Sequence, residues 1–202
     1  MTLRRLFLPA LFSPFLVCSG LDELSNSEAF LAASLAALKT PKMQNAPIQV
    51  SGAITHATGL QEDYGARAIV AIPDKKIMQL NLGAPPESAQ PLCRLWVKGY
   101  HLTHDGKVIA SEKAANLEVA AEGENHKVTV WLLALRKNTQ GGAEIIVCAD
   151  QPEPVLALPA VALSDPAPAN DDAPVELSAE GDKLTVTILG SHRIELGLQE
   201  KS

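Results

Sequence analysis

The pattern of apolar positions predicts two adjacent β-strands between Lys127 and Asp150. The runs KVTVWLLAL and EIIVCAD are rich in β-branched residues and leucine, and the loop RKNTQGGA between them contains two glycines. From residue 128 to residue 135, both alternating sets of side chains are mostly apolar. A strand that is apolar on both faces is usually covered on both faces. We therefore expect a central hairpin whose first strand lies within a sheet, under other layers.

Further strands are predicted on both sides of this hairpin in the sequence. Before it, short apolar or alternating runs indicate strands in IQVSGAITHA, ARAIVAI, KIMQLNL and LCRLWVKGYHL. The Asp105-Gly106 pair predicts a tight turn after the last of these. After the hairpin, residues 155–163 fit an irregular edge strand, because Pro159 has no N–H to donate to a ladder. Residues 175–202 regain the alternation of strands and fit a strand pair or a three-strand meander.

One helix is predicted, within residues 21–39 (LDELSNSEAFLAASLAALK). Ser25 or Ser27 can cap its N-terminus, and Pro41 limits its extension. One stripe of the helix carries three leucines, Leu31, Leu35 and Leu38. Alanine-rich faces of this kind dock on a sheet or on a partner, and we expect this one to dock on its own domain.

Short strands separated by turns, after one helix, are typical of an antiparallel β-sandwich, or a partly open barrel, with one N-terminal α-helix. A chain of 202 residues is long enough to bury its own core. We divide it into a signal peptide (1–20), a helix and connector (21–47), a β-sandwich core (48–163), a Pro- and Asp-rich linker (164–174) and a C-terminal β-hairpin that packs on the core (175–202).

Residues 1–20 have the organisation of a secretory signal peptide. MTLRR supplies two positive charges, an uncharged apolar run from Leu6 to Val17 follows, and small residues come next. The apolar run is too short to cross a bilayer, which takes about 20 residues. We therefore expect cleavage after Gly20 and an extracytoplasmic protein that is periplasmic, attached to the outer membrane or secreted.

Two other interpretations of this segment stay open. Cys18 could carry a lipid and anchor the protein to a membrane, although Val17 before it is a poor match to such sites. Residues 6–17 could instead form a buried helix of the mature fold, although Pro9 and Pro14 disfavour a continuous helix there.

The cysteines predict one disulfide. Removal of Cys18 with the signal peptide would leave Cys93 and Cys148, and an even number in an exported protein suggests a bridge. Both lie in strand-like runs that paired strands or facing sheets could bring together. The alternative is two separate buried thiols that behave as small apolar side chains.

The net charge of −6 disfavours nucleic acid as a partner, because phosphates need clustered lysine and arginine. No basic run is longer than Arg4-Arg5 or Lys75-Lys76. We expect a protein partner or self-assembly, no nucleic acid, and membrane contact only through a lipid anchor at Cys18.

Candidate chemistry is sparse. His101 and His104 in HLTHDG are weak candidates for metal ligands, because residues three apart on a strand point to opposite faces. No local motif indicates an activated cysteine or serine nucleophile, and Gly141-Gly142 lacks the phosphate-binding pattern. We therefore predict no catalytic residue and no cofactor.

These features predict a bacterial envelope β-sandwich that is not an enzyme and has a binding or assembly role. Its edge strands, or the alanine-rich helix, would form its partner surfaces. A second interpretation is a structural component of a virion or particle, with residues 1–40 as a packing arm. A third is a small extracytoplasmic hydrolase or metal-binding protein that uses His101, His104 or a cysteine.

Overall fold

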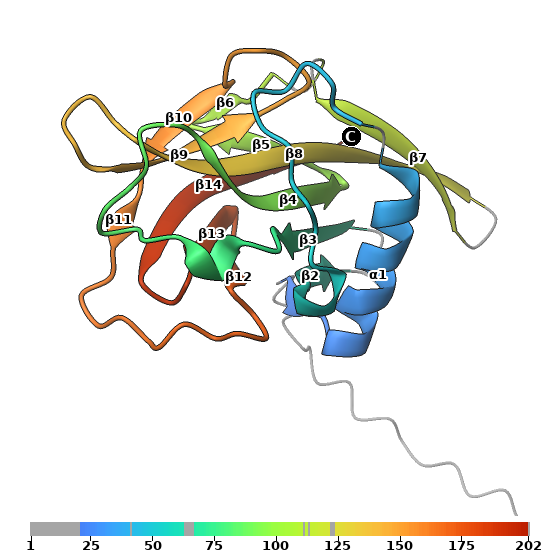
Figure 1. Ribbon diagram of the computed structural model, residues 1–202. Coiled ribbons are helices and arrows are strands. Elements are labelled where there is room, and N and C mark those ends of the chain that lie inside the picture. The colour runs from blue at the N-terminus through green and yellow to red at the C-terminus, as the bar shows by residue number, and fades with distance from the viewer. Residues whose placement is uncertain are drawn as a thin grey trace, which may run out of the picture.

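The protein is built from two antiparallel sheets that pack face to face, with one α-helix on the outer face of the larger sheet (Figure 1). A computed structural model describes residues 21–40, 42–62, 67–110, 112, 114–121 and 124–201. The sheets do not close into a barrel. The predicted mainly β, antiparallel fold with one N-terminal helix is therefore confirmed.

The larger sheet has eight strands, seven of them in the order β1-β2-β3-β4-β8-β9-β10. Strand β8 pairs with β4 along one edge, and with β7 and then β9 along the other. The predicted central strand thus lies within the sheet. The bounds in chain order are β1 (Asp22–Glu23), β2 (Thr58–Glu62), β3 (Arg67–Pro73), β4 (Gln90–Lys98), β7 (Ala115–Ala121), β8 (Glu124–Lys137), β9 (Ala143–Cys148) and β10 (Leu156–Pro159).

The smaller sheet has the order β12-β13-β14-β5-β6, and β11 pairs with the start of β14. The C-terminal segment contributes three of these strands, which is the three-strand meander of the two predicted alternatives. Strands β5 and β6 are joined by the predicted turn, where Asp105 and Gly106 both have positive φ (50° and 71°). The bounds are β5 (Tyr100–His104), β6 (Lys107–Val108), β11 (Val161–Ala162), β12 (Val175–Glu180), β13 (Lys183–Ile188) and β14 (His192–Glu200).

The chain passes from the larger to the smaller sheet at Gly99. The sequence pattern predicts one strand over LCRLWVKGYHL, but β4 ends at Lys98 and β5 begins at Tyr100. Gly99 has a φ of +76°, and a Cβ there would lie 2.5 Å from Cγ of Arg67. Because the chain turns at this glycine, Trp96 packs in the outer layer while Tyr100 joins the core between the sheets.

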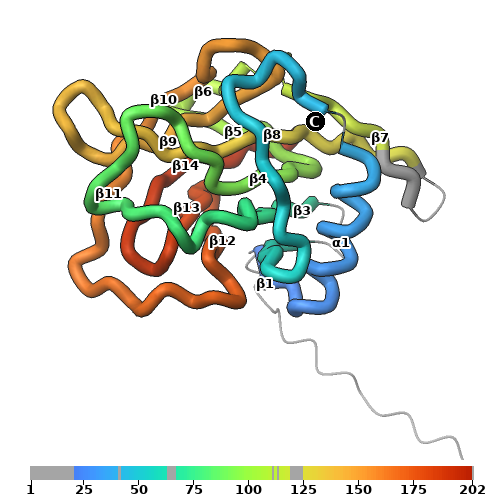
Figure 2. The backbone as a smooth tube through the Cα atoms, in the orientation of Figure 1, coloured from blue at the N-terminus to red at the C-terminus, as the bar shows by residue number. Residues whose placement is uncertain are grey.

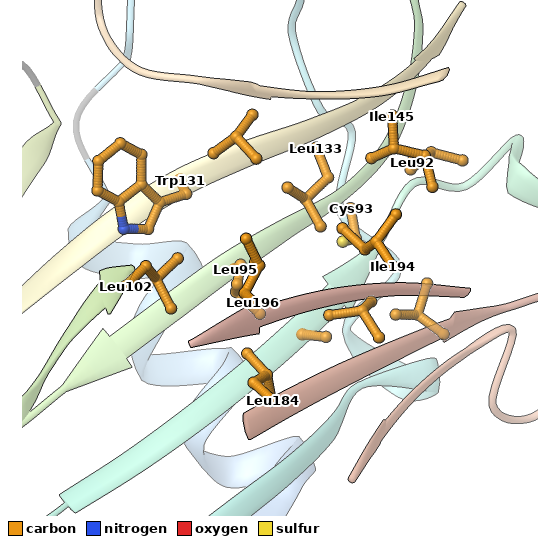
Figure 3. Close-up of a cluster of buried hydrophobic side chains, with 14 of the residues drawn as sticks. Leu92, Cys93, Leu95, Leu102, Trp131, Leu133, Ile145, Leu184, Ile194 and Leu196 are labelled. Atoms are coloured by element: carbon orange, nitrogen blue, oxygen red, sulfur yellow. The ribbon is translucent and has the colours of Figure 1, made fainter. Parts of the chain in front are cut away.

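The main core fills the space between the two sheets. Figure 3 shows Trp131 and Leu133 of β8 and Leu95 of β4 facing Leu184 and Leu196 of the smaller sheet. All five side chains are at most 2% exposed. Alternate residues along each strand face this layer, so the alternation of apolar residues in the sequence explains which side chains lie in the core.

A second apolar layer covers the outer face of the larger sheet. Helix α1 (Asn26–Lys39) and the connector after it pack against the other face of β8, including Val130 and Leu132. Figure 2 shows the connector crossing β8, β4 and β3. Its buried side chains are Met43, Ile48 and Val50. The prediction that β8 is covered on both faces is therefore confirmed.

Helix α1 begins with a capping box. The backbone N–H of Glu28 donates to Oγ of Ser25, and the N–H of Ser25 donates to the Glu28 carboxylate. The helix buries three of its five alanines against the domain, and these are Ala29, Ala33 and Ala36. Small side chains let the helix approach the strands closely, so the predicted docking on its own domain is correct.

Two predicted strands are absent from the described structure. IQVSGAITHA forms the connector and a short 3₁₀ turn, η1 (Ile54–His56), and KIMQLNL contains a second, η3 (Ile77–Gln79). Both segments are tied to Asp74, which is 3% exposed. Its carboxylate accepts from the N–H groups of Ser51 (2.6 Å) and Lys76 (2.9 Å), which binds the connector to the turn. This side-chain bonding competes with continued strand pairing.

The segment from 155 to 174 joins the two sheets along one side. Strand β10 pairs with β9 at the sheet edge and includes Pro159, as predicted, and β11 then pairs with β14. The predicted linker is attached to the smaller sheet rather than free, because the N–H of Ala167 donates to the carbonyl of Gly190 and that of Leu189 to the carbonyl of Pro174.

Truncation of Leu133 to alanine should lower the free energy of unfolding by about 2–5 kcal/mol, because it leaves a cavity between the sheets. Leu38→Ala is the control, since Leu38 is 84% exposed, and it should change stability by less than about 0.5 kcal/mol. Urea unfolding followed by circular dichroism measures both. Equal losses in the two variants would contradict the assignment of the core.

Candidate binding groove

The leucine stripe of α1 faces away from the sheet. Leu31 is 62% exposed, Leu35 43% and Leu38 84%, and Phe30 on a neighbouring face is 48% exposed. A helix that is apolar on its outer face as well as its docked face usually has a second contact surface. The sequence identified the stripe, but the structure shows that the alanines, and not the leucines, make the contact with the domain.

A groove runs beside this stripe, between α1 and the outer face of the larger sheet. Its volume is about 270 Å³. Leu31 and Leu35 form the helix wall, and Val70, Trp96 and Val128 form part of the floor, from β3, β4 and β8. The remaining lining residues are Leu24, Glu28, Ala32, Gln61, Ala68, Lys98 and His126.

The polar groups of the groove lie among a mostly apolar lining. Glu28 is occupied by the helix cap, and its hydrogen bonds with Ser25 lower the pKa of the carboxyl group. Lys98 and His126 add polar heads from the ends of β4 and β8. The indole N–H of Trp96 donates to the hydroxyl of Thr40 (3.2 Å), which fixes the ring on the floor. This arrangement can bind an apolar group.

His101 and His104 do not share a site with a third ligand. His104 Nε2 lies 3.4 Å from Asp105 Oδ2 in the turn. His101 has a buried Nδ1 without a hydrogen-bond partner, and burial and the charge of Lys201 lower its pKa. Among the described residues, no group of three or more His, Cys, Asp or Glu side chains could hold a metal ion.

The Cys93–Cys148 disulfide is not formed, which corrects the prediction. Both cysteines are free and 0% exposed. Cys93 lies in the core between the sheets and Cys148 in the outer layer, so the larger sheet separates them. Burial raises the pKa of the Cys93 thiol to about 12 and that of Cys148 to about 11. The alternative prediction, two separate buried thiols that behave as small apolar side chains, is therefore correct for the described structure.

The signal peptide and the candidate lipidation site at Cys18 lie outside the described residues. Within the described part of the chain, no helix is both long and apolar enough to cross a membrane.

The sequence did not identify the groove residues as a set. The strand register places Trp96 of β4 opposite Val70 of β3, and Lys98 of β4 opposite Val128 of β8. This register cannot be derived from the sequence of any one strand. The one indication in the sequence was that α1 is apolar on two faces, one with alanines and one with leucines.

Comparison with protein families, with curated proteins and with solved structures found no match.

The free thiols give a direct test. In a Cys18→Ser variant purified without reductant, Ellman's reagent at pH 8 should not react with the folded protein, because both thiols are inaccessible. After unfolding in guanidinium, two thiols per chain should react. An unfolded, unreduced protein without reactive thiols would restore the disulfide prediction.

Proposed function

We propose that this chain is an exported bacterial β-sandwich that binds an amphipathic helix of a partner protein along α1. The observation that supports this most strongly is the exposed stripe of Leu31, Leu35 and Leu38 beside an apolar groove. An exposed apolar patch next to a depression is typical of a protein interaction site.

A helix suits the groove better than an extended segment. Strands lie about 4.8 Å apart and helices pack about 10 Å apart, so one helix covers roughly two strands. Helix α1 contacts β2 and β3, whereas the floor of the groove continues over β4 and β8. A second helix would lie beside α1 on this floor. The spacing of the leucines, at i, i+4 and i+7, matches the contact stripe of a helix.

The export part of the proposal depends on residues 1–20. Their order of charges, apolar run and small residues is that of a secretory signal. The interpretations as a particle component and as a hydrolase or metal protein stay hypotheses, and no contact among the described residues favours either.

Trp96 provides a probe for helix binding. An 18-residue peptide of leucine, alanine and lysine, with leucines on one helical face, should change the emission of Trp96 saturably. Trp131 lies in the main core, 1% exposed, and should contribute a constant background. The Leu35→Glu variant should bind the peptide roughly ten- to a hundredfold more weakly, which corresponds to the burial of one leucine.

Val161→Glu is the matched control, because Val161 is 52% exposed on β11, in the smaller sheet. It should leave peptide binding unchanged. Equal binding of a peptide with the same composition but scrambled leucines would contradict a helix as the partner. Saturable binding of laurate in place of the peptide would indicate an acyl ligand, and dimerisation lost in Leu35→Glu would indicate a second copy of the chain.

Export is tested by the intact mass of protein recovered from an exporting bacterial host. We expect the mass of residues 21–202. A full-length chain in the cytoplasm would contradict export, and a diacylglycerol adduct on Cys18 would place the protein on a membrane.

A further inference from the structure

Arg94 is a cation without a carboxylate partner among the described residues. It lies on β4, where its Nη2 donates to the carbonyl oxygen of Val50 at 3.2 Å. Its Nε is shielded from solvent and has no hydrogen-bond partner. Burial lowers the pKa of the guanidinium group, but arginine remains protonated in proteins. Buried charges are normally paired, because their desolvation is costly.

Arg136, four residues beyond the Leu132 that pairs with Arg94, shows the usual arrangement. It lies on β8, and its Nε donates to the carboxylate of Glu144 on β9 at 2.6 Å. The larger sheet therefore provides a carboxylate for Arg136 but none for Arg94. The unpartnered Nε of Arg94 could donate to an acceptor from outside the described chain.

A cavity of about 640 Å³ lies against Arg94, between the end of α1, the connector and the sheet. This volume is within the range of small-molecule sites, about 300–1,000 Å³. Its polar lining consists of Arg94, Lys42, Gln44, Gln49 and Thr40, with no acidic side chain among the lining residues. The apolar lining is Ala37, Met43, Val50 and Leu132.

We propose that this cavity binds a small amphiphilic anion, with its carboxylate or phosphate group on Arg94 and Lys42. A planar guanidinium can donate two parallel hydrogen bonds to such a group. The apolar part of the anion would lie on Met43 and Leu132. The site is separate from the helix-binding groove, and its assignment does not depend on the proposed partner.

The unliganded protein should show the cost of the unpaired charge. Arg94→Met removes a half-buried guanidinium whose Nε is shielded from solvent, and keeps an unbranched side chain of similar reach. Its urea midpoint should equal or exceed that of the native protein. In contrast, Arg136→Met leaves Glu144 without its partner and should lower the midpoint.

Calorimetry with hexanoate, hexyl phosphate, inorganic phosphate and hexylammonium tests binding. We expect one saturable site for hexanoate or hexyl phosphate and none for hexylammonium. Inorganic phosphate alone should bind more weakly, because it lacks the apolar part. Arg94→Met should weaken binding about ten- to a hundredfold, as expected for the loss of hydrogen bonds to a charged group, and Arg136→Met should leave it unchanged.

Arg94→Lys keeps the charge but loses the paired donors, so it should fold and still bind more weakly than the native protein. Native affinity in Arg94→Met, or no binding of either alkyl anion to the native protein, would overturn the proposal. A large fall of the Arg94→Met midpoint without any effect of anions would instead assign Arg94 a structural role.

Discussion

Strand β8 must be covered on both faces, because its side chains are apolar on both. All eight residues from 128 to 135 are at most 4% exposed, and Thr129 is the one polar residue among them. The smaller sheet covers one face with a layer of interdigitated aliphatic side chains. The other face is covered by one helix and an irregular connector. Both the groove and the Arg94 cavity lie beside the elements of this second cover.

Helix α1 shows how close docking and free apolar surface arise from one sequence. Its alanines carry little side chain, so the helix backbone lies near β2 and β3. Its leucines occupy the opposite face, where their burial would need another molecule. At the C-terminal end of the helix, the hydroxyl of Thr40 lines the anion cavity. It accepts a hydrogen bond from the indole N–H of Trp96, which lines the groove. The hydrogen bond between Trp96 and Thr40 thus joins a wall of the groove to a wall of the cavity.

The sequence predicted the fold class, the double burial of β8, the capped helix and the Asp105-Gly106 turn, because these depend on local periodicity and turn chemistry. The sequence did not predict features that depend on contacts between residues far apart in the chain. Asp74 accepts hydrogen bonds from Ser51 in the connector and from Lys76 at the start of KIMQLNL, which contains a 3₁₀ turn. The position of Cys93 and Cys148 on opposite faces of the larger sheet depends on strand order. The role of Arg94 could not be predicted, because the absence of a carboxylate beside it among the described residues is visible only once the strands are paired.

The proposed binding surface depends on the orientation of α1, and cysteine accessibility tests this orientation most directly. In a Cys18→Ser background, single Leu35→Cys and Ala33→Cys substitutions place a thiol on the outer and the docked face of the same helix. The structure predicts fast maleimide labelling of the folded protein at position 35 and protection at position 33 until the protein unfolds. Protection at position 35 with fast labelling at position 33 would show that the leucines dock on the sheet, and would contradict both the helix orientation and the binding surface derived from it.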